Sequence, residues 1–311
     1  ADPSIDCLVI ASPNHLHVEQ LEAALTARPI PVLVEKPLYT SADQLGALSA
    51  LAARDPAVWV AMEYRYMPPI ATLIRDAVDV TGGIKMLTIR EHRFPFLPKV
   101  GDWNRFNRYT GGTFVEKCCH FFDLMRLLLP GEPIRVMASA GQAVNHLDEH
   151  YGGETPDILD HGYAIVEFDS GCRALLELSM FAEGSRFQEE ISAVGPAGKI
   201  EAHVPGPTRF WPEHLGAPPV PQVIVSPRSP KGPRTVDVPV APSLLAAGDH
   251  NGSTFYQHQQ FARFVRERGA AAVSLFDGAM AVAMGLAAQE SAATGRAVDV
   301  AAPFEPTRRA A

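Results

Sequence analysis

Lys36 lies in the segment Val34-Glu35-Lys36-Pro37, directly after a short apolar run. The residue before a proline is held in an extended backbone, so the ammonium group is aimed in one direction instead of trailing along a helix. An aimed lysine can donate hydrogen bonds to a ligand. The other interpretation is a solvated lysine that closes a strand, and position alone supports the two equally.

A second reactive segment is Gly111-Gly112-Thr113-Phe114-Val115-Glu116-Lys117-Cys118-Cys119-His120. Glu116 and His120 are four residues apart, a spacing that places them on the same face of a helix. A histidine beside a carboxylate is a plausible proton-transfer pair, because the carboxylate can orient the ring and support its charged form. Gly111 and Gly112 would let the start of the helix approach a ligand closely.

Three other interpretations of this segment stay open. Thr113 and Glu116 have the spacing of a capping box, so Glu116 could simply close the helix start. His120 could be a hydrogen-bonded core histidine. A metal site is the third possibility, and it would need further ligands such as Asp160 and His161.

The elements that must position these residues begin with alternating strands and helices. Apolar runs predict strands buried on both faces at 6–11, 31–34 and 58–62. Between and after them we expect helices, the second at 41–54 with Ser41 and Gln44 in capping-box spacing. This order is typical of a parallel sheet with crossover helices, and ligands of such sheets bind at the carboxyl ends of the strands. The expected helices are one with Val18, Leu21, Ala24 and Leu25 on one face, one at 41–54 and one at 69–78.

After Gly83 the apolar residues alternate, which predicts half-exposed strands. A mixed or antiparallel sheet is the natural inference, and the prolines at 204–248 indicate loops and edge strands. We expect one domain at 1–82 and a second at 83–311, with the final helices able to pack back on the first. Strands are expected at 85–93, 135–142, 162–168, 172–180 and 189–194, and helices at 113–129, 253–268 and 275–294.

Composition narrows the class of partner. The chain has 311 residues, a formal net charge of −8 and no runs of lysine and arginine, which argues against a nucleic acid or an anionic membrane. The sequence contains no apolar run of about 18 residues, so it predicts no membrane span. The four cysteines match no zinc or disulfide pattern, so we expect reduced thiols and a cytoplasmic location.

Several motifs, in this order along the chain, resemble the Gfo/Idh/MocA family, which includes glucose–fructose oxidoreductase and inositol dehydrogenase. The resemblance runs nearly from end to end. Its residues are Asp6 to His17, Glu35-Lys36-Pro37, Glu63-Tyr64-Arg65-Tyr66, Gly111 to His120, Gly195-Pro196-Ala197-Gly198, and Ser291 with Gly295 in the final helix.

The resemblance implies a Rossmann-type nucleotide domain followed by an α/β domain with a large open sheet, which often mediates homodimers or homotetramers. It implies NAD or NADP as cofactor and a sugar, polyol or related hydroxyl compound as substrate. Lys36 would lie beside the nicotinamide and the reacting hydroxyl. The Lys36–Pro37 peptide bond is expected to be cis. His120 would be the general base. Glu116 stands where the family usually has aspartate, which leaves its direct catalytic role open.

The resemblance also assigns residues to the two ligands. Glu35 would lie near the nicotinamide ribose, and the Ser12-Pro13 turn with Asn14 would line the nicotinamide side. Residues expected at the cofactor are Ser12, Pro13, Asn14, His17, Glu35, Lys36, Pro37, Glu63 and Arg65. Residues expected at the substrate are Lys36, Trp103, Glu116 and His120, with Arg65 bordering the same pocket.

The chain departs from the family pattern in one respect. No G-x-G-x-x-G segment precedes or follows Asp6 in the right context, so we expect the first strands of the nucleotide domain, roughly 60 residues, to lie outside this chain. The alternative function is a sugar-binding or regulatory relative without redox chemistry. A third possibility is an inert fragment that serves only an oligomer interface. Keeping both Lys36 and His120 favours the enzyme.

Overall fold

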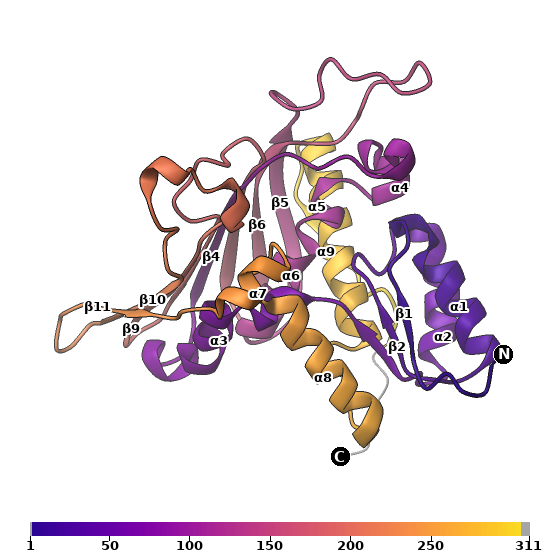
Figure 1. Cartoon of the computed structure of the whole chain (residues 1–311), viewed down its shortest axis with the longest axis horizontal. Coiled ribbons are helices and arrows are strands. Elements are labelled where there is room, and N and C mark those ends of the chain that lie inside the picture. The colour runs from indigo at the N-terminus through magenta and orange to yellow at the C-terminus, as the bar shows by residue number, and fades with distance from the viewer. Residues whose placement is uncertain (1, 306–311) are drawn as a thin grey trace.

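The N-terminal unit is a three-stranded parallel sheet with strand order β1-β2-β3 (Figure 1). Its register aligns Ile10 with Val34 and Val34 with Val60, so the carboxyl ends of the strands lie side by side. The predicted parallel sheet is therefore confirmed in the computed structural model, which describes residues 2–305. The elements of this unit are β1 (Leu8–Ile10), η1 (Asn14–Leu16), α1 (His17–Ala27), β2 (Val32–Val34), η2 (Ala42–Gln44), α2 (Leu45–Ala52), β3 (Val58–Val60) and η3 (Glu63–Tyr66). The next helix, α3 (Pro68–Thr81), leads into the second unit and packs on its sheet.

The C-terminal unit is built on a nine-stranded mixed sheet with order β11-β10-β9-β8-β4-β7-β6-β5-β12. β4 and β7 are parallel and the other neighbours are antiparallel, which confirms the predicted mixed sheet. Its strands are β4 (Met86–His92), β5 (Pro133–Gly141), β6 (His161–Phe168), β7 (Arg173–Ser179), β8 (Glu189–Val194), β9 (Gly198–Val204), β10 (Gln222–Pro227), β11 (Arg234–Asp237) and β12 (Val298–Asp299). The remaining elements are η4 (Val100–Arg105), α4 (Asn107–Thr110), α5 (Thr113–Glu116), α6 (Cys119–Leu128), η5 (Thr208–Phe210), η6 (Glu213–Leu215), α7 (Pro242–Ala247), α8 (Ser253–Glu267) and α9 (Leu275–Thr294).

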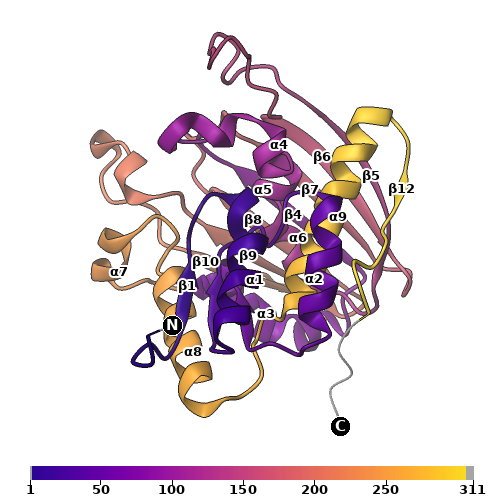
Figure 2. The same cartoon turned by 90° about the vertical axis from the view of Figure 1, so that its right-hand side faces the viewer.

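Helices α3, α6 and α9 cover one face of the large sheet (Figures 1 and 2). α9 also contacts β3 of the small sheet. Gly278 permits this contact, because a Cβ at that position would lie 2.7 Å from the Val60 methyl groups. α8 packs on the small sheet, where Phe261 and Phe264 contact Trp59 edge-on. α9 thus joins the two sheets.

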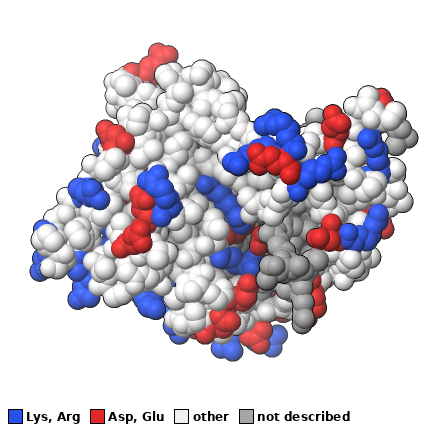
Figure 3. Space-filling view, turned by 90° about the horizontal axis from the view of Figure 1, so that it is seen from below, with Lys and Arg blue, Asp and Glu red and all other residues white. Residues whose placement is uncertain are grey.

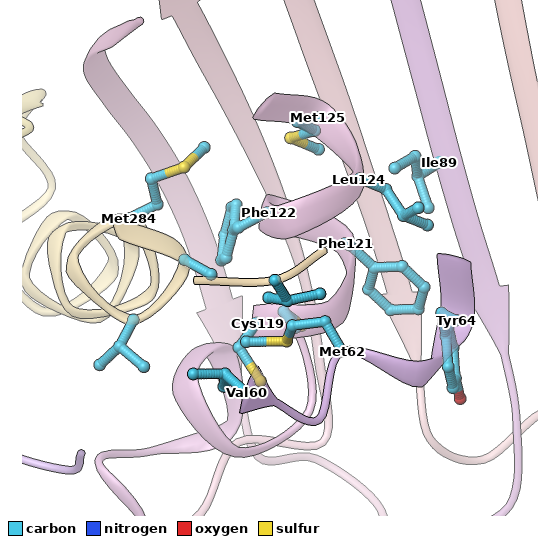
Figure 4. Packing of buried hydrophobic residues seen from close by; sticks show 14 of the residues in the cluster. Val60, Met62, Tyr64, Ile89, Cys119, Phe121, Phe122, Leu124, Met125 and Met284 are labelled. Carbon is cyan, nitrogen blue, oxygen red and sulfur yellow. The ribbon is translucent and has the colours of Figure 1, made fainter. Parts of the chain in front are cut away.

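A continuous apolar core links the two units. Figure 4 shows Phe122 of α6 on the side of α9, and Phe121 and Leu124 on the side of Ile89, with Tyr64 at the margin of the cluster and its hydroxyl pointing away from it. Burying each such side chain contributes about 1.5–3 kcal/mol. The core therefore holds η3 and α6 at a constant separation.

Three local predictions were wrong. The helix expected at 113–129 is broken at Lys117 and Cys118 into α5 and α6. Ser41 makes no side-chain cap, because Gln44 instead accepts from the Thr40 backbone N–H at 2.8 Å. β1 is not buried on both faces, since Val9 is 45% exposed.

The face of the large sheet opposite the helices is exposed. Apolar side chains on this face are exposed by 37% to 61%, namely Met86, Met137, Tyr163, Ile165 and Val194. Elsewhere on the surface, Figure 3 shows positive and negative side chains interspersed over the face seen from below. Across residues 2–305, no helix is both long and apolar enough to cross a membrane.

Candidate active site

Lys36 lies at the carboxyl end of β2, and its ammonium group is held by Glu116. The Nζ atom donates to the Glu116 carbonyl oxygen at 2.9 Å and lies 3.9 Å from the carboxylate Oε1. The side chain is 20% exposed, so it is neither solvated nor closed off. The interpretation of Lys36 as a freely solvated strand end is therefore excluded.

Glu116 joins the two units of the site. Its Oε2 accepts a hydrogen bond from Nδ2 of Asn14, which follows β1. The capping-box interpretation is wrong, because α5 has no side-chain cap and the Thr113 hydroxyl donates instead to the Leu159 carbonyl at 2.6 Å. Glu116 thus places the Asn14 amide and the Lys36 ammonium beside each other.

His120 is in the first turn of α6 and is 2% exposed. Its ring stacks on Tyr64 with centroids 4.2 Å apart and planes inclined by 7°, and its Nδ1 has no hydrogen-bond partner among the described residues. The expected carboxylate–histidine pair is not formed, because the break after α5 directs Glu116 toward Asn14 and Lys36. The histidine and the carboxylate belong to one site but do not bond to each other.

The two central groups have pKa values shifted in opposite directions. Burial, and then the positive charge of Lys36, lower the pKa of His120 well below its ordinary value. Burial opposes the charged form of Lys36, but Glu116 and Cys119 outweigh it and raise the pKa of Lys36. At neutral pH the site therefore holds a neutral imidazole and an ammonium group, as an acid–base site requires.

Glu35 and the cis Lys36–Pro37 peptide bond complete the end of β2. The predicted cis bond is present. Glu35 Oε2 accepts from the Lys36 backbone N–H at 3.3 Å, which leaves acceptor capacity on the carboxylate. Burial, and then the neighbouring Glu63, raise the pKa of Glu35.

His17 connects the turns that follow β1 and β2. Its Nδ1 lies 2.7 Å from the Pro37 carbonyl oxygen and its Nε2 lies 2.9 Å from the Ser12 carbonyl oxygen. The ring is fully buried. Both ring nitrogens face backbone carbonyl oxygens, so His17 shapes this edge of the sheet. The Pro13 carbonyl oxygen begins η1 by accepting a hydrogen bond from the Leu16 backbone N–H.

Glu63 anchors the region before α8 to the carboxyl end of β3. Its Oε1 lies 2.9 Å from His250 Nδ1, and its Oε2 accepts from the hydroxyls of Thr254 and, at 3.3 Å, Ser253. Burial opposes ionisation, but the hydrogen bond and charge of His250 outweigh it and lower the pKa of Glu63 to about 2. Nothing in the sequence pattern around 250 pointed to this contact.

Arg65 is bound by Asp123 and Ala272, and Trp103 lies beside η1. Arg65 is bound to Asp123 of α6 through Nε at 2.6 Å and Nη2, and Nη1 donates to the Ala272 carbonyl at 2.8 Å. Trp103 lies edge-on to His15, with ring centroids 6.4 Å apart. The donors of Arg65 are thus occupied by protein groups, whereas Trp103 borders η1.

The paired glycines serve packing. A Cβ on Gly112 would lie 2.2 Å from the Gln289 side chain, and one on Gly111 would lie 2.8 Å from the Thr40 carbonyl oxygen. Both residues have positive φ, a conformation that glycine adopts without strain. The glycines therefore allow α5 to approach α9 and the chain after β2. The sequence had suggested that this close approach would be to a ligand.

The metal hypothesis finds no support in the structure. Asp160 accepts from the backbone N–H groups of 143–145 and from His161 Nδ1 at 2.8 Å. Among residues 2–305 no cluster of three histidine, cysteine or acidic side chains could hold a metal ion. Asp160 closes a loop, and its partners are backbone amides.

The residues at the carboxyl ends of the small sheet fit a dinucleotide. Glu35 retains acceptor capacity for a ribose hydroxyl, and Lys36 and Asn14 present donors at the same edge. Crevices at this end of parallel strands are where open α/β sheets bind nucleotides.

Two family models match the chain. Residues 1–64 match the NAD-binding Rossmann fold of an oxidoreductase family, GFO_IDH_MocA, and residues 76–300 match its C-terminal alpha/beta domain. The first match supports NAD or NADP as the cofactor.

Individual relatives are more distant. The chain is 27% identical over 204 residues to inositol 2-dehydrogenase from Rhizobium meliloti, covering 65% of this chain and 58% of that protein. It is 31% identical over 188 residues to D-xylose 1-dehydrogenase (NADP(+)) 2 from Haloferax volcanii, covering 58% and 51%. The chain thus spans little more than half the length of these relatives.

A solved structure with the same fold is that of a putative myo-inositol dehydrogenase from Sinorhizobium meliloti 1021. It superposes with a TM-score of 0.73 at 22% identity, over 96% of this chain and 82% of that one. Because the family models together match most of the chain, the protein belongs to the Gfo/Idh/MocA oxidoreductase family.

Proposed function

We propose that the protein is an NAD(P)-dependent dehydrogenase that acts on a CH–OH group of a sugar, polyol or related compound. One observation carries the proposal. An ammonium group fixed by Glu116 lies at the carboxyl edge of a parallel sheet, close enough to the buried imidazole of His120 for its charge to lower the pKa of that ring. A protein that only binds sugars has no evident need for a proton acceptor next to an aimed lysine.

Bound NAD(P)+ supplies the hydride acceptor. Lys36 donates a hydrogen bond from Nζ to the reacting hydroxyl oxygen, since its bond to the Glu116 carbonyl leaves other N–H groups free. The imidazole of His120 accepts the hydroxyl proton as the hydride departs, and returns it in reduction. Glu116 keeps Lys36 charged and in place, which assigns it a positioning role.

The remaining site residues shape the two pockets. Asn14, Glu35 and Pro37 line the nicotinamide side together with the Ser12-Pro13 turn, which His17 holds in place. Glu63 closes the third strand end through His250. Trp103 borders the substrate, and the donors of Arg65 are occupied by Asp123 and the Ala272 carbonyl.

The test is turnover by the full-length protein with a panel of hydroxyl compounds. The panel contains myo-inositol, scyllo-inositol and D-xylose, each with NAD+ and with NADP+, and reduced nicotinamide is followed by its ultraviolet absorbance. We expect cofactor reduction with at least one compound, and reversal when its oxidised product, a ketone or a lactone, is supplied with reduced cofactor. Tight sugar binding in calorimetry without cofactor reduction would favour the sugar-binding relative instead.

The exposed face of the large sheet supports a homodimer or homotetramer. Met86, Tyr163 and Ile165 lie on this face with 61%, 54% and 40% exposure, and exposed apolar patches of this kind mark interaction sites. Light scattering after size exclusion gives the oligomeric state. Tyr163→Lys should shift it toward the monomer, and an unchanged mass would contradict this assignment.

The cysteines support a cytoplasmic location. Cys118, Cys119 and Cys172 are buried free thiols and Cys7 is half-buried. Free thiols are typical of reducing compartments. Alkylation of the purified protein with and without prior reduction should label the same number of cysteines.

A further inference from the structure

Three charged residues that the proposed chemistry does not use are buried behind His120. Glu91 of β4 and Glu189 of β8 are fully buried, and Lys117, in the break between α5 and α6, has a side chain only 4% exposed. Desolvating such groups is expensive unless they are paired. A buried charged cluster beside a candidate active site calls for a functional explanation.

The cluster has a defined geometry. Glu91 and Glu189 are directly opposite each other in the antiparallel β4–β8 pair, so their carboxylates share the face of the sheet that α6 covers. Lys117 Nζ lies 2.8 Å from Glu91 Oε1, and Gln188 Nε2 donates to Glu189 Oε1 at 2.6 Å. Arg93 Nη1 lies 3.7 Å from the same Glu91 oxygen.

Lys117 connects this cluster to the proton acceptor through Tyr64. Its Nζ donates a hydrogen bond to the Tyr64 hydroxyl and lies 4.5 Å from the centroid of the ring. The ring of Tyr64 in turn stacks in parallel on the ring of His120. Tyr64 is 1% exposed, so the ring has no room to adopt another orientation while Lys117 holds its hydroxyl.

We propose that Lys117 is a positioning residue for the proton-transfer step, which, anchored by Glu91, holds the Tyr64 ring against His120 and so fixes the plane of the imidazole. This inference rests on the proposed function. His120 has no hydrogen-bond partner at Nδ1 among the described residues, whereas proton-transferring histidines are commonly oriented by a hydrogen bond at one ring nitrogen. In this protein stacking takes over that task.

The structure explains why an ion pair is needed to keep the Tyr64 ring in place against His120. Stacking alone leaves a phenol ring free to slide, and a hydrogen bond from a fixed ammonium group prevents this. Lys117 cannot relax toward solvent, because Glu91 and Phe121 enclose it. Misplacing a reacting group by about 1 Å can cost roughly 100-fold in rate, so the orientation of the imidazole matters directly.

The test compares variants of the full-length protein. Lys117→Met/Glu91→Gln removes both members of the ion pair together, and Tyr64→Leu removes the stacking ring itself. We expect both to lower kcat by roughly 10- to 100-fold, with KM and cofactor Kd within about twofold. The matched control is Arg126→Met, which removes a largely buried cation of α6 that pairs with Glu132 and Asp277 and not with Tyr64.

A second readout separates this inference from the proposed function. Histidine-labelled NMR gives the pKa of His120, whose ring faces the positive groups Lys36, Lys117, His250 and Arg93 and stacks on Tyr64. The double variant removes Lys117, one of the positive charges that lower the pKa of His120, and Tyr64→Leu uncovers the ring and admits water. The pKa of His120 should therefore rise in both variants and stay constant in Arg126→Met. This shift should appear even if no compound in the panel is oxidised.

Two results would overturn the inference. One is an unmoved His120 pKa in both variants. The other is a kcat within about twofold of wild type, with only the melting temperature lowered, since this is what a purely structural cluster would give. Failure of the wild-type protein to reduce any cofactor, with the His120 shift present, would instead count against the proposed function alone and leave the Lys117–Tyr64–His120 contact supported.

Discussion

The ring of His120 lies parallel to the ring of Tyr64, with centroids 4.2 Å apart. The two residues come from different parts of the chain, since Tyr64 follows the last strand of the small sheet and His120 starts the helix that covers the large one. This contact therefore forms only when the two sheets are docked. It places the proposed proton acceptor at the junction where the cofactor side and the substrate side of the site meet.

Lys36 should be required for turnover but not for folding. Lys36→Met keeps much of the side-chain volume and removes the ammonium group that Glu116 holds, so kcat should fall by at least about 100-fold. Cofactor affinity measured by calorimetry should change little. Lys231→Met, at an exposed position, is the control, and near-normal turnover in Lys36→Met would remove the central assignment.

His120 should dominate the pH dependence of oxidation. A base must be neutral to accept a proton, and burial and Lys36 lower the pKa of His120 below 6.5, so activity should be lost only as pH falls through that lower value. His120→Ala should depress kcat about 100-fold or more and remove this acidic limb.

Glu116→Gln should do less harm than His120→Ala, because the amide can still contact Asn14. It should also lower the pKa of Lys36, whose positive charge Glu116 supports, so its activity should decline at a lower alkaline pH than in wild type. The reverse ranking of the two variants would make Glu116 the primary acid–base residue.

Arg65 should matter for stability more than for cofactor binding. Arg65→Met leaves Asp123 buried and unpaired, with a side chain 1% exposed, and breaking a buried pair of this kind costs about 3–5 kcal/mol. Urea unfolding should show that loss, while the folded variant binds cofactor with unchanged Kd. Weaker cofactor binding at unchanged stability would instead support a direct cofactor contact for Arg65.

Glu189 should make stability depend on pH near neutrality. Burial, and then the charge of Glu91, raise the pKa of Glu189 to about 7, from an ordinary value of 4.5. The folded protein therefore binds more protons than the unfolded chain between these values, and stability should decrease as pH rises from 4.5 to about 7. Glu189→Gln keeps the oxygen that Gln188 contacts and removes the charge.

The melting temperature of Glu189→Gln should exceed that of wild type at pH values above about 7, and the difference should shrink toward pH 4.5. Scanning calorimetry across this range measures it. An equal difference at every pH would mean that Glu189 does not titrate in this interval. Glu190→Gln, at the neighbouring position on the opposite face of β8, is the control.

Much of the architecture was predictable from the sequence, because apolar periodicity is a local property. Short apolar runs identified β2 and β3, and the helix expected at 275–294 is α9. The order of motifs identified the family, which the family models confirm. The strands at 198–204 and 222–227 were not separated from loops, because proline and glycine lie close to them.

What the tertiary structure alone decided is the set of partners of each reactive group. The spacing predicted Glu116 and His120 on one helix face, but the helix is interrupted between them. Glu116 therefore contacts Asn14 and Lys36, and His120 stacks on Tyr64. Local sequence determines which elements form, since it sets hydrophobic periodicity and backbone preference. Side-chain partners depend on how separate elements dock, and buried charges such as Lys117 are stable only beside the opposite charge that docking supplies.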